Sequence, residues 1–231
     1  MKFINKKVNF KKFFLHKSIH NLALINDQIK LKFGSTNNYE IIAVSKTLPI
    51  SEIHPLIENG HLHFGENKVQ EAVEKWSAIK NSHEHLKLHM IGKLQTNKVK
   101  YVIPLFDYIH SLDNIKLAEK IAEVQLKENK SLKIFIQVNI GKELQKAGID
   151  VGDLQNFYKI CSQELRLNII GLMCIPPKNG LVKNYFNEMQ ELKKTLNIEN
   201  LSMGMSEDYL DAIACGSTYV RIGSKIFGER S

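Results

Sequence analysis

The chain has 231 residues, of which 43% are hydrophobic and 24% are charged. These values are ordinary for a globular protein with one sizeable core, and they exclude a disordered chain, a collagen-like repeat and a disulfide-rich miniprotein. No apolar run reaches the roughly 18 residues that a membrane-spanning helix needs, so we expect no membrane partner.

The net charge of +8 is concentrated at the N-terminus. Residues 1–33 contain eight Lys and one acidic residue, so this segment carries +7 and the remainder of the chain carries +1. A nucleic-acid-binding domain spreads basic residues over a folded face, so we expect a solvated terminal helix and no nucleic-acid partner. The segment lacks the Arg of a mitochondrial presequence and the apolar stretch of a secretory signal, so we expect a cytoplasmic protein.

The first predicted element is a helix within residues 1–33, with an expected apolar face of Leu22, Leu24, Ile25, Ile29 and Leu31. Eight apolar runs of strand length follow, separated by segments with helical spacing. These runs are 40–45, 61–64, 87–91, 108–111, 134–139, 168–174, 201–203 and 218–222. Polar residues able to cap a helix occur between the runs, and the expected caps are Ser51, Asn67, Asp113, Asp150 and Ser206.

Strands that alternate with helices in this way indicate an α/β fold, a single (β/α)8 TIM barrel with an extra N-terminal helix. The length allows about 29 residues for each βα unit, which leaves no room for a second domain. We therefore predict a basic N-terminal extension over residues 1–33, packed on a barrel over residues 34–231. An open doubly wound sheet is the alternative.

Functional residues of a βα barrel lie at the carboxyl ends of its strands. Lys46 follows the first run and shares a strand face with Ile42 and Val44. If that face points into the barrel, burial lowers the pKa of the amine and makes it a nucleophile that can form a Schiff base with an aldehyde. A lysine that ends a strand and points into solvent is the alternative, and spacing alone favours it.

The last two runs end in turns rich in glycine and serine, at 202–206 and 221–224. Glycine lets the main chain approach an anion, and the N–H groups and hydroxyl at a helix start bind phosphate. Two such turns on neighbouring strands indicate a phosphate site, with ordinary helix caps as the alternative. Arg221 shares a strand face with Gly223, and a buried arginine needs an acceptor, either a ligand atom or a core carboxylate.

The cysteines and histidines show no metal-site spacing. Cys161 and Cys174 lie in apolar patterns and are expected to be reduced packing residues. The histidines between residues 61 and 89 fit no compact site and lack a carboxylate cluster, so we expect no metal. His89 is expected in the third strand.

Seven short blocks occur in order along the chain. They are AVSKT (43–47), FGENKVQE (64–71), HMIGKLQTNK (89–98), QVNI (137–140), GLM (171–173), LSMGMS (201–206) and GSTYVRIG (216–223). Together they resemble the pyridoxal 5′-phosphate homeostasis protein family, whose fold is similar to the fold-type III barrel domain of alanine racemase. No single block is specific for this family, but the seven blocks in this order are.

This resemblance implies that Lys46 carries pyridoxal 5′-phosphate (PLP) as a Schiff base. The phosphate would be held by Ser206, Gly223 and Ser224, with main chain near Met203 and Gly204. Arg221 would face the pyridine nitrogen, and Asn67 and Met173 would lie beside the ring.

The resemblance further implies a PLP-binding protein of vitamin B6 homeostasis, which releases PLP to acceptors such as PLP-dependent apoenzymes. A permanently charged Arg221 discourages protonation of the pyridine nitrogen and weakens the ring as an electron sink, so we expect a non-catalytic protein. The chain lacks the second domain with which the racemase dimerises, so we expect a monomer. The alternative is a PLP-dependent amino-acid racemase, which needs a second base, whereas Tyr219 reads as core packing.

Overall fold

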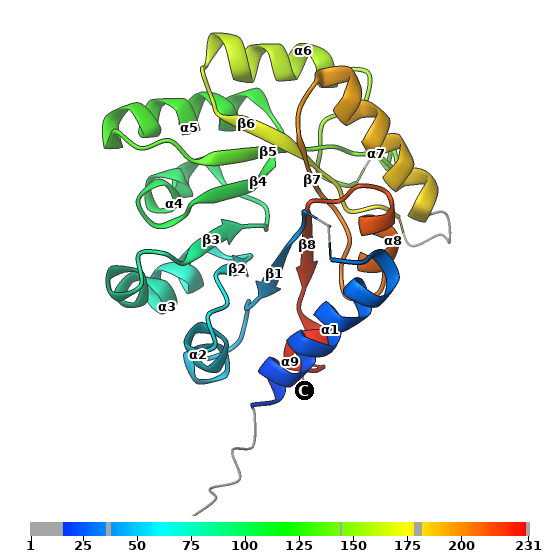
Figure 1. The fold of residues 1–231 in the computed structure, drawn as a ribbon. Coiled ribbons are helices and arrows are strands. Elements are labelled where there is room, and N and C mark those ends of the chain that lie inside the picture. Colours follow the sequence, from blue (N-terminus) through cyan, green and yellow to red (C-terminus); the bar gives the residue numbers. More distant parts are fainter. Residues whose placement is uncertain (1–15, 36–37, 144, 178–181, 230–231) are drawn as a thin grey trace, which may run out of the picture.

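The computed structural model describes residues 16–35, 38–143, 145–177 and 182–229. Eight parallel strands close into a barrel in chain order, and the helices lie outside the ring of strands (Figure 1). The strands are β1 (Glu40–Val44), β2 (His63–Glu66), β3 (Lys87–Met90), β4 (Tyr108–Leu112), β5 (Lys133–Gln137), β6 (Ile169–Met173), β7 (Asn200–Ser202) and β8 (Tyr219–Ile222). The predicted barrel is confirmed, and the closed strand order rules out the open sheet.

The helices follow the predicted alternation. They are α1 (Lys17–Phe33), α2 (Ile50–Glu58), α3 (Val69–Ser82), α4 (Val99–Leu105), α5 (Ile115–Glu128), α6 (Leu154–Lys159), α7 (Val182–Leu196), α8 (Tyr209–Ala214) and α9 (Ser224–Phe227). A 3₁₀ turn (Thr96–Lys98) precedes α4, and a π-helical turn (Ile160–Glu164) extends α6.

The predicted helix caps are wrong at all five positions. The first turn of α5, for example, is capped by Asn114, whose side chain accepts a hydrogen bond from Leu117 N–H at 2.9 Å, and not by Asp113. Helix α8 begins after Asp208, two residues beyond Ser206. Helices α2 and α3 begin after Pro49 and Lys68, neither of which forms a side-chain cap, so a nearby residue with a capping side chain does not by itself mark the helix start.

The apolar face predicted for α1 is partly wrong. Leu22, Ile25 and Ile29 are buried, but Leu24 and Leu31 are 47% and 90% exposed. At 3.6 residues per turn the three buried residues share one face, whereas Leu24 and Leu31 fall on the opposite side of the helix.

Helix α1 packs beside α9 on the outside of the barrel (Figure 1). Asn21 Nδ2 donates a hydrogen bond to Ile226 O at 2.9 Å, which joins the two helices directly. Of the basic extension predicted over residues 1–33, residues 1–15 lie outside the described part of the chain.

The strand alternation gives the barrel two apolar layers. Outward side chains pack under the helices in the main core. Inward side chains form a smaller cluster, which consists of Ile42, Tyr108, Phe135, Met173 and Tyr219. β1 and β8 pair in parallel with Ile42 opposite Arg221, so the residues that follow the first strand lie next to those that follow the last.

Candidate functional site

Lys46 lies in the turn that directly follows β1, and it is half-buried. Ile42, which was expected to share a strand face with Lys46, points into the barrel. The next residue, Thr47, has φ 63°, a left-handed conformation that is strained for a residue with a side chain. The turn that carries the candidate nucleophile is therefore held in an unusual shape.

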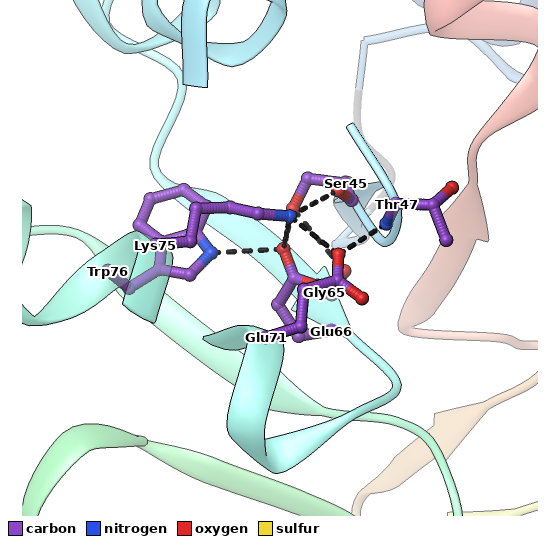
Figure 2. Close-up of polar contacts among 7 residues, drawn as sticks. All are labelled: Ser45, Thr47, Gly65, Glu66, Glu71, Lys75 and Trp76. Atoms are coloured by element: carbon purple, nitrogen blue, oxygen red, sulfur yellow. Dashed lines mark hydrogen bonds and ion pairs between the residues drawn. The ribbon is translucent and has the colours of Figure 1, made fainter. Parts of the chain in front are cut away.

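A buried carboxylate lies beside this turn (Figure 2). Glu66, at the end of β2, is fully buried, and its Oε1 accepts hydrogen bonds from Ser45 Oγ at 2.7 Å and from Trp76 Nε1 at 3.0 Å. The same oxygen lies 3.0 Å from Lys75 Nζ. Three donors on one oxygen stabilise the charged carboxylate inside the core.

Lys75 and Glu71 of α3 connect this carboxylate to both neighbours of Lys46 (Figure 2). Lys75 Nζ donates to Ser45 O and to Glu71 Oε1, each at 2.9 Å, and Glu71 Oε1 also accepts from Thr47 N–H. Burial alone would raise the pKa of Glu71, but the hydrogen bonds from Lys75 and Thr47, together with the charges of Lys75 and Lys68, lower it. Helix α3 therefore fixes the main chain on either side of Lys46.

This support for Lys46 was not predicted from the sequence. Glu66 and Glu71 belong to the block FGENKVQE, and Lys75 lies one helical turn beyond Glu71. That i, i+4 spacing was the available signal for an acid–lysine pair on one helix face.

The turns after β7 and β8 meet at one hydroxyl. Ser206 Oγ accepts from Gly223 N–H at 3.4 Å and from Lys225 N–H at 3.5 Å. Ser224, between these two donors, is exposed. Two main-chain N–H groups and two hydroxyls thus gather at the rim, a donor set suited to a phosphate.

Gly204 and Met203 have structural positions below this rim. Gly204 has φ +90°, and a Cβ on it would lie 2.4 Å from Ala212 Cβ, so glycine is required there. The Met203 side chain is buried in the outer layer, and its N–H donates to Tyr219 O at 3.1 Å within the barrel.

Arg221 is buried inside the barrel, as its strand face predicts. Nη1 donates to Ser202 O at 2.7 Å and to Ser202 Oγ at 2.8 Å, and Nη2 donates to Cys174 O at 2.9 Å. Burial lowers the pKa of this guanidinium. Among the described residues no carboxylate forms an ion pair with it, so the expected alternative, a core ion pair, is wrong there.

A hollow of ≈ 490 Å³ lies between the β1 turn and the β8 turn. Val44 and Thr47 line it on one side, and Gly223 and Ser224 line it on the other. Lys46, between Val44 and Thr47 in the sequence, is not itself a lining residue, and the rest of the lining comes from Leu48, Pro49, Glu52, Phe227, Gly228 and Glu229. The volume is in the usual range for a small-molecule site, about 300–1,000 Å³.

The two expected ring neighbours occupy different surroundings. Asn67 is half-buried and directly follows β2 at the rim. Met173 ends β6 and is buried in the inward-facing cluster beside Ile42. The structure thus places Asn67 at the barrel mouth and Met173 at the floor of the mouth.

Two cysteines were expected to pack in the core. Cys161 and Cys174 are free and buried, as predicted. Within the described ranges, no cluster of His, Cys, Asp and Glu is arranged to hold a metal ion. Nor does any helix of that part combine the length and apolar character needed to cross a membrane.

Comparison with known proteins identifies the family. A family model described as alanine racemase, N-terminal domain, matches residues 18–231. The pyridoxal phosphate homeostasis protein of Haemophilus influenzae is 39% identical over 226 residues, which cover 92% of this chain and 95% of that protein. The chain belongs to the pyridoxal phosphate homeostasis protein family. The Escherichia coli K12 member is 37% identical over 227 residues, covering 91% of this chain and 96% of the relative.

Solved structures agree with this membership. PipY of Synechococcus elongatus PCC7942, determined with PLP bound, is 35% identical and superposes with a TM-score of 0.80, covering 91% of this chain and 100% of PipY. Alanine racemase from Corynebacterium glutamicum superposes with a TM-score of 0.69 at 13% identity, covering 94% of this chain and 62% of the racemase. The latter likeness shows the barrel fold alone.

Proposed function

We propose that this protein binds PLP in the hollow between the β1 and β8 turns and serves PLP homeostasis. The observation that carries the proposal is that one hollow is bordered by the turn of Lys46 and by the hydroxyl and N–H donors of the β8 turn. PipY, a relative with a PLP-bound structure that matches nearly the whole chain, supports the same assignment.

Each site residue has a role that its position allows. Bound PLP supplies an aldehyde that condenses with a primary amine, with loss of water, and Lys46 is the amine at the rim. Ser206, Gly223 and Ser224 hold the phosphate. Arg221, buried beneath them with its charge retained, faces the pyridine nitrogen, and Asn67 and Met173 border the ring.

Lys46→Ala tests the attachment. The wild-type protein is expected to show an absorbance band at about 420 nm with PLP, and borohydride reduction is expected to fix PLP on the peptide that contains Lys46. The variant should lose the band and the label while retaining its circular dichroism. Lys68→Ala is the matched control, because Lys68 is an exposed lysine that follows β2 at the same end of the barrel. A label on another lysine in the wild-type protein would refute the assignment.

The same geometry supports a non-catalytic role. A cationic Arg221 beside the pyridine nitrogen keeps the ring a poor electron sink. Tyr219, the expected core residue, is buried in the inward-facing cluster, and burial together with its hydrogen bond to Tyr108 raises the pKa of its hydroxyl. It is therefore poorly suited to act as a base at neutral pH.

Hydrogen exchange separates this role from the racemase alternative. Loaded protein mixed with L-alanine in deuterated buffer is expected to leave the α-hydrogen in place, as observed by proton NMR. Rapid incorporation of deuterium would establish the racemase. We infer that the protein acts as a monomer and delivers PLP to apoenzymes, whose regained activity on mixing with loaded protein is the measure of transfer.

A further inference from the structure

Three histidines stand in series inside the barrel and form an imidazole column: His63 of β2, His89 of β3 and His110 of β4. His63 Nδ1 lies 2.9 Å from His89 Nε2, and His89 Nδ1 lies 2.9 Å from His110 Nε2. Tyr108 stacks on His89 and Phe135 stacks on His110, which fixes the orientation of both rings. The ring nitrogens pair with one another and do not converge on a common point.

The column connects the two ends of the barrel. Toward the rim, His110 Nδ1 lies 2.8 Å from Ser202 Oγ, the same oxygen that accepts from Arg221 Nη1 at 2.8 Å. At the other end, His63 Nε2 lies 3.4 Å from Oε2 of Glu40, the first residue of β1. Glu40 is half exposed and lines a separate hollow of ≈ 470 Å³. An unbroken series of polar contacts therefore runs from a carboxylate open to solvent to the buried guanidinium.

The three imidazoles are neutral at neutral pH. Burial lowers the pKa of His63 to about 4, and it lowers the pKa values of His89 and His110 well below the usual range. Besides Glu40, the titratable and charged groups around His63 are His61, Lys87, Asp107 and Lys133. A neutral imidazole has one N–H donor and one acceptor nitrogen, so each contact between rings contains a single hydrogen.

The two ends of the column determine where these hydrogens lie. An ionised Glu40 only accepts, so His63 carries its hydrogen on Nε2, and the same then holds for His89 and His110. His110 Nδ1 is left as an acceptor for the hydroxyl of Ser202. That hydroxyl offers its lone pairs to Arg221, which only donates. We propose that Glu40, the imidazole column and Ser202 form one ordered hydrogen-bond chain that positions Arg221, and that Glu40 sets its direction.

The direction of the hydrogen-bond chain matters for Arg221 because the hydroxyl hydrogen of Ser202 can also point away from His110. If the chain reversed, His110 would donate to Ser202, the hydroxyl would accept from both His110 and Arg221, and its own hydrogen would lose the His110 acceptor inside the buried core. The ordered chain avoids that loss and holds Nη1 in place. The consequence for PLP rests on the proposed function, in which Arg221 meets the pyridine nitrogen.

Nitrogen-15 NMR of PLP-free protein labelled at histidine tests the order directly, because correlations between ring protons and nitrogens distinguish the two neutral tautomers. We expect His63, His89 and His110 all to carry hydrogen on Nε2 at pH 7. A mixture of tautomers along the column, or a charged imidazole within it, would overturn the proposal.

Glu40→Lys tests whether Glu40 sets the direction of the hydrogen-bond chain. A lysine at this position donates to His63 Nε2 and should move the hydrogen of all three imidazoles to Nδ1, including that of His110 on the far side of the barrel. Glu58→Lys is the matched control, because Glu58 lies beside His54 on exposed helix α2 and has no contact with the column. Unchanged tautomers in a folded Glu40→Lys variant would show that Glu40 does not direct the chain.

Ser202→Ala tests the positioning of Arg221. The variant interrupts the chain next to the guanidinium and should shift the absorbance maximum of bound PLP and its pH dependence, with PLP still fixed on Lys46 by borohydride. An unchanged spectrum would refute the positioning role. Failure of wild-type Lys46 to take up PLP would instead refute the proposed function and leave the tautomer result standing.

Discussion

At the scale of single residues, Lys75 makes several close polar contacts beside Lys46, the candidate nucleophile. Its amine touches Glu66, Glu71 and the carbonyl of Ser45 at once, and its side chain is only 9% exposed. Glu66 Oε2 has no hydrogen-bond partner and is shielded from solvent. The donors of Ser45, Lys75 and Trp76 all reach its other oxygen.

Lys75→Met is expected to lower the free energy of unfolding by about 3–5 kcal/mol, because it leaves the Glu66 carboxylate buried without its cation. Urea unfolding measures the loss. The double variant Glu66→Gln/Lys75→Met should recover part of it, since no uncompensated charge remains. Lys120→Met, which breaks an exposed ion pair with Glu123, is the control and should change stability by less than about 1 kcal/mol. Equal losses for the two single variants would contradict this account.

The strand pattern correctly predicted the residues whose role follows from alternation. Ile42, Arg221 and Tyr219 face into the barrel as expected, because a period of two is read directly from the chain. It did not find Glu66 or His110, because their partners lie on neighbouring strands and helices. Their contacts depend on the register between strands, which the pattern of a single strand does not contain.

At the scale of elements, the strands were located within two residues, because short apolar runs alternate with longer segments of helical spacing. The N-terminal helix shows where the pattern fails. A list of apolar residues in α1 includes Leu24 and Leu31, yet only the face with Leu22, Ile25 and Ile29 meets the barrel.

This difference gives a matched pair of variants on one helix. Ile29→Ala is expected to lower the free energy of unfolding by about 2–5 kcal/mol, because Ile29 is fully buried and a cavity remains. Leu31→Ala, at a position 90% exposed, should leave it within about 0.5 kcal/mol of the wild-type value. Urea unfolding of both proteins provides the comparison. Similar losses would mean that α1 docks by a different face.

At the scale of the whole molecule, the buried histidines make the fold sensitive to acid. The folded-state pKa values of His63, His89 and His110 lie below the unfolded value of about 6.5, so the unfolded chain binds more protons as the pH falls. Their contribution to stability is complete above about pH 6.5 and is lost as the pH falls toward the folded pKa, about 4 for His63.

We expect the free energy of unfolding to fall by about 1.4 kcal/mol per pH unit for each of these histidines below about pH 6. Urea titrations between pH 7 and pH 5 give the slope. His63→Gln should reduce the slope by the equivalent of one proton, whereas His54→Gln removes a half-exposed imidazole and is the control. A slope that is unchanged in His63→Gln would show that this ring is protonated in the folded protein.

Closure of the barrel between β1 and β8 has a consequence for biosynthesis. The turn of Lys46 is among the first parts of the barrel to leave the ribosome, and the donors of the β8 turn are among the last. In the proposed PLP site, a nascent chain whose β8 has not yet emerged offers the amine of Lys46 without the donors proposed to hold the phosphate. Under that proposal, loading with PLP follows synthesis of β8, and we expect a product terminated before Tyr219 to fail to retain the cofactor.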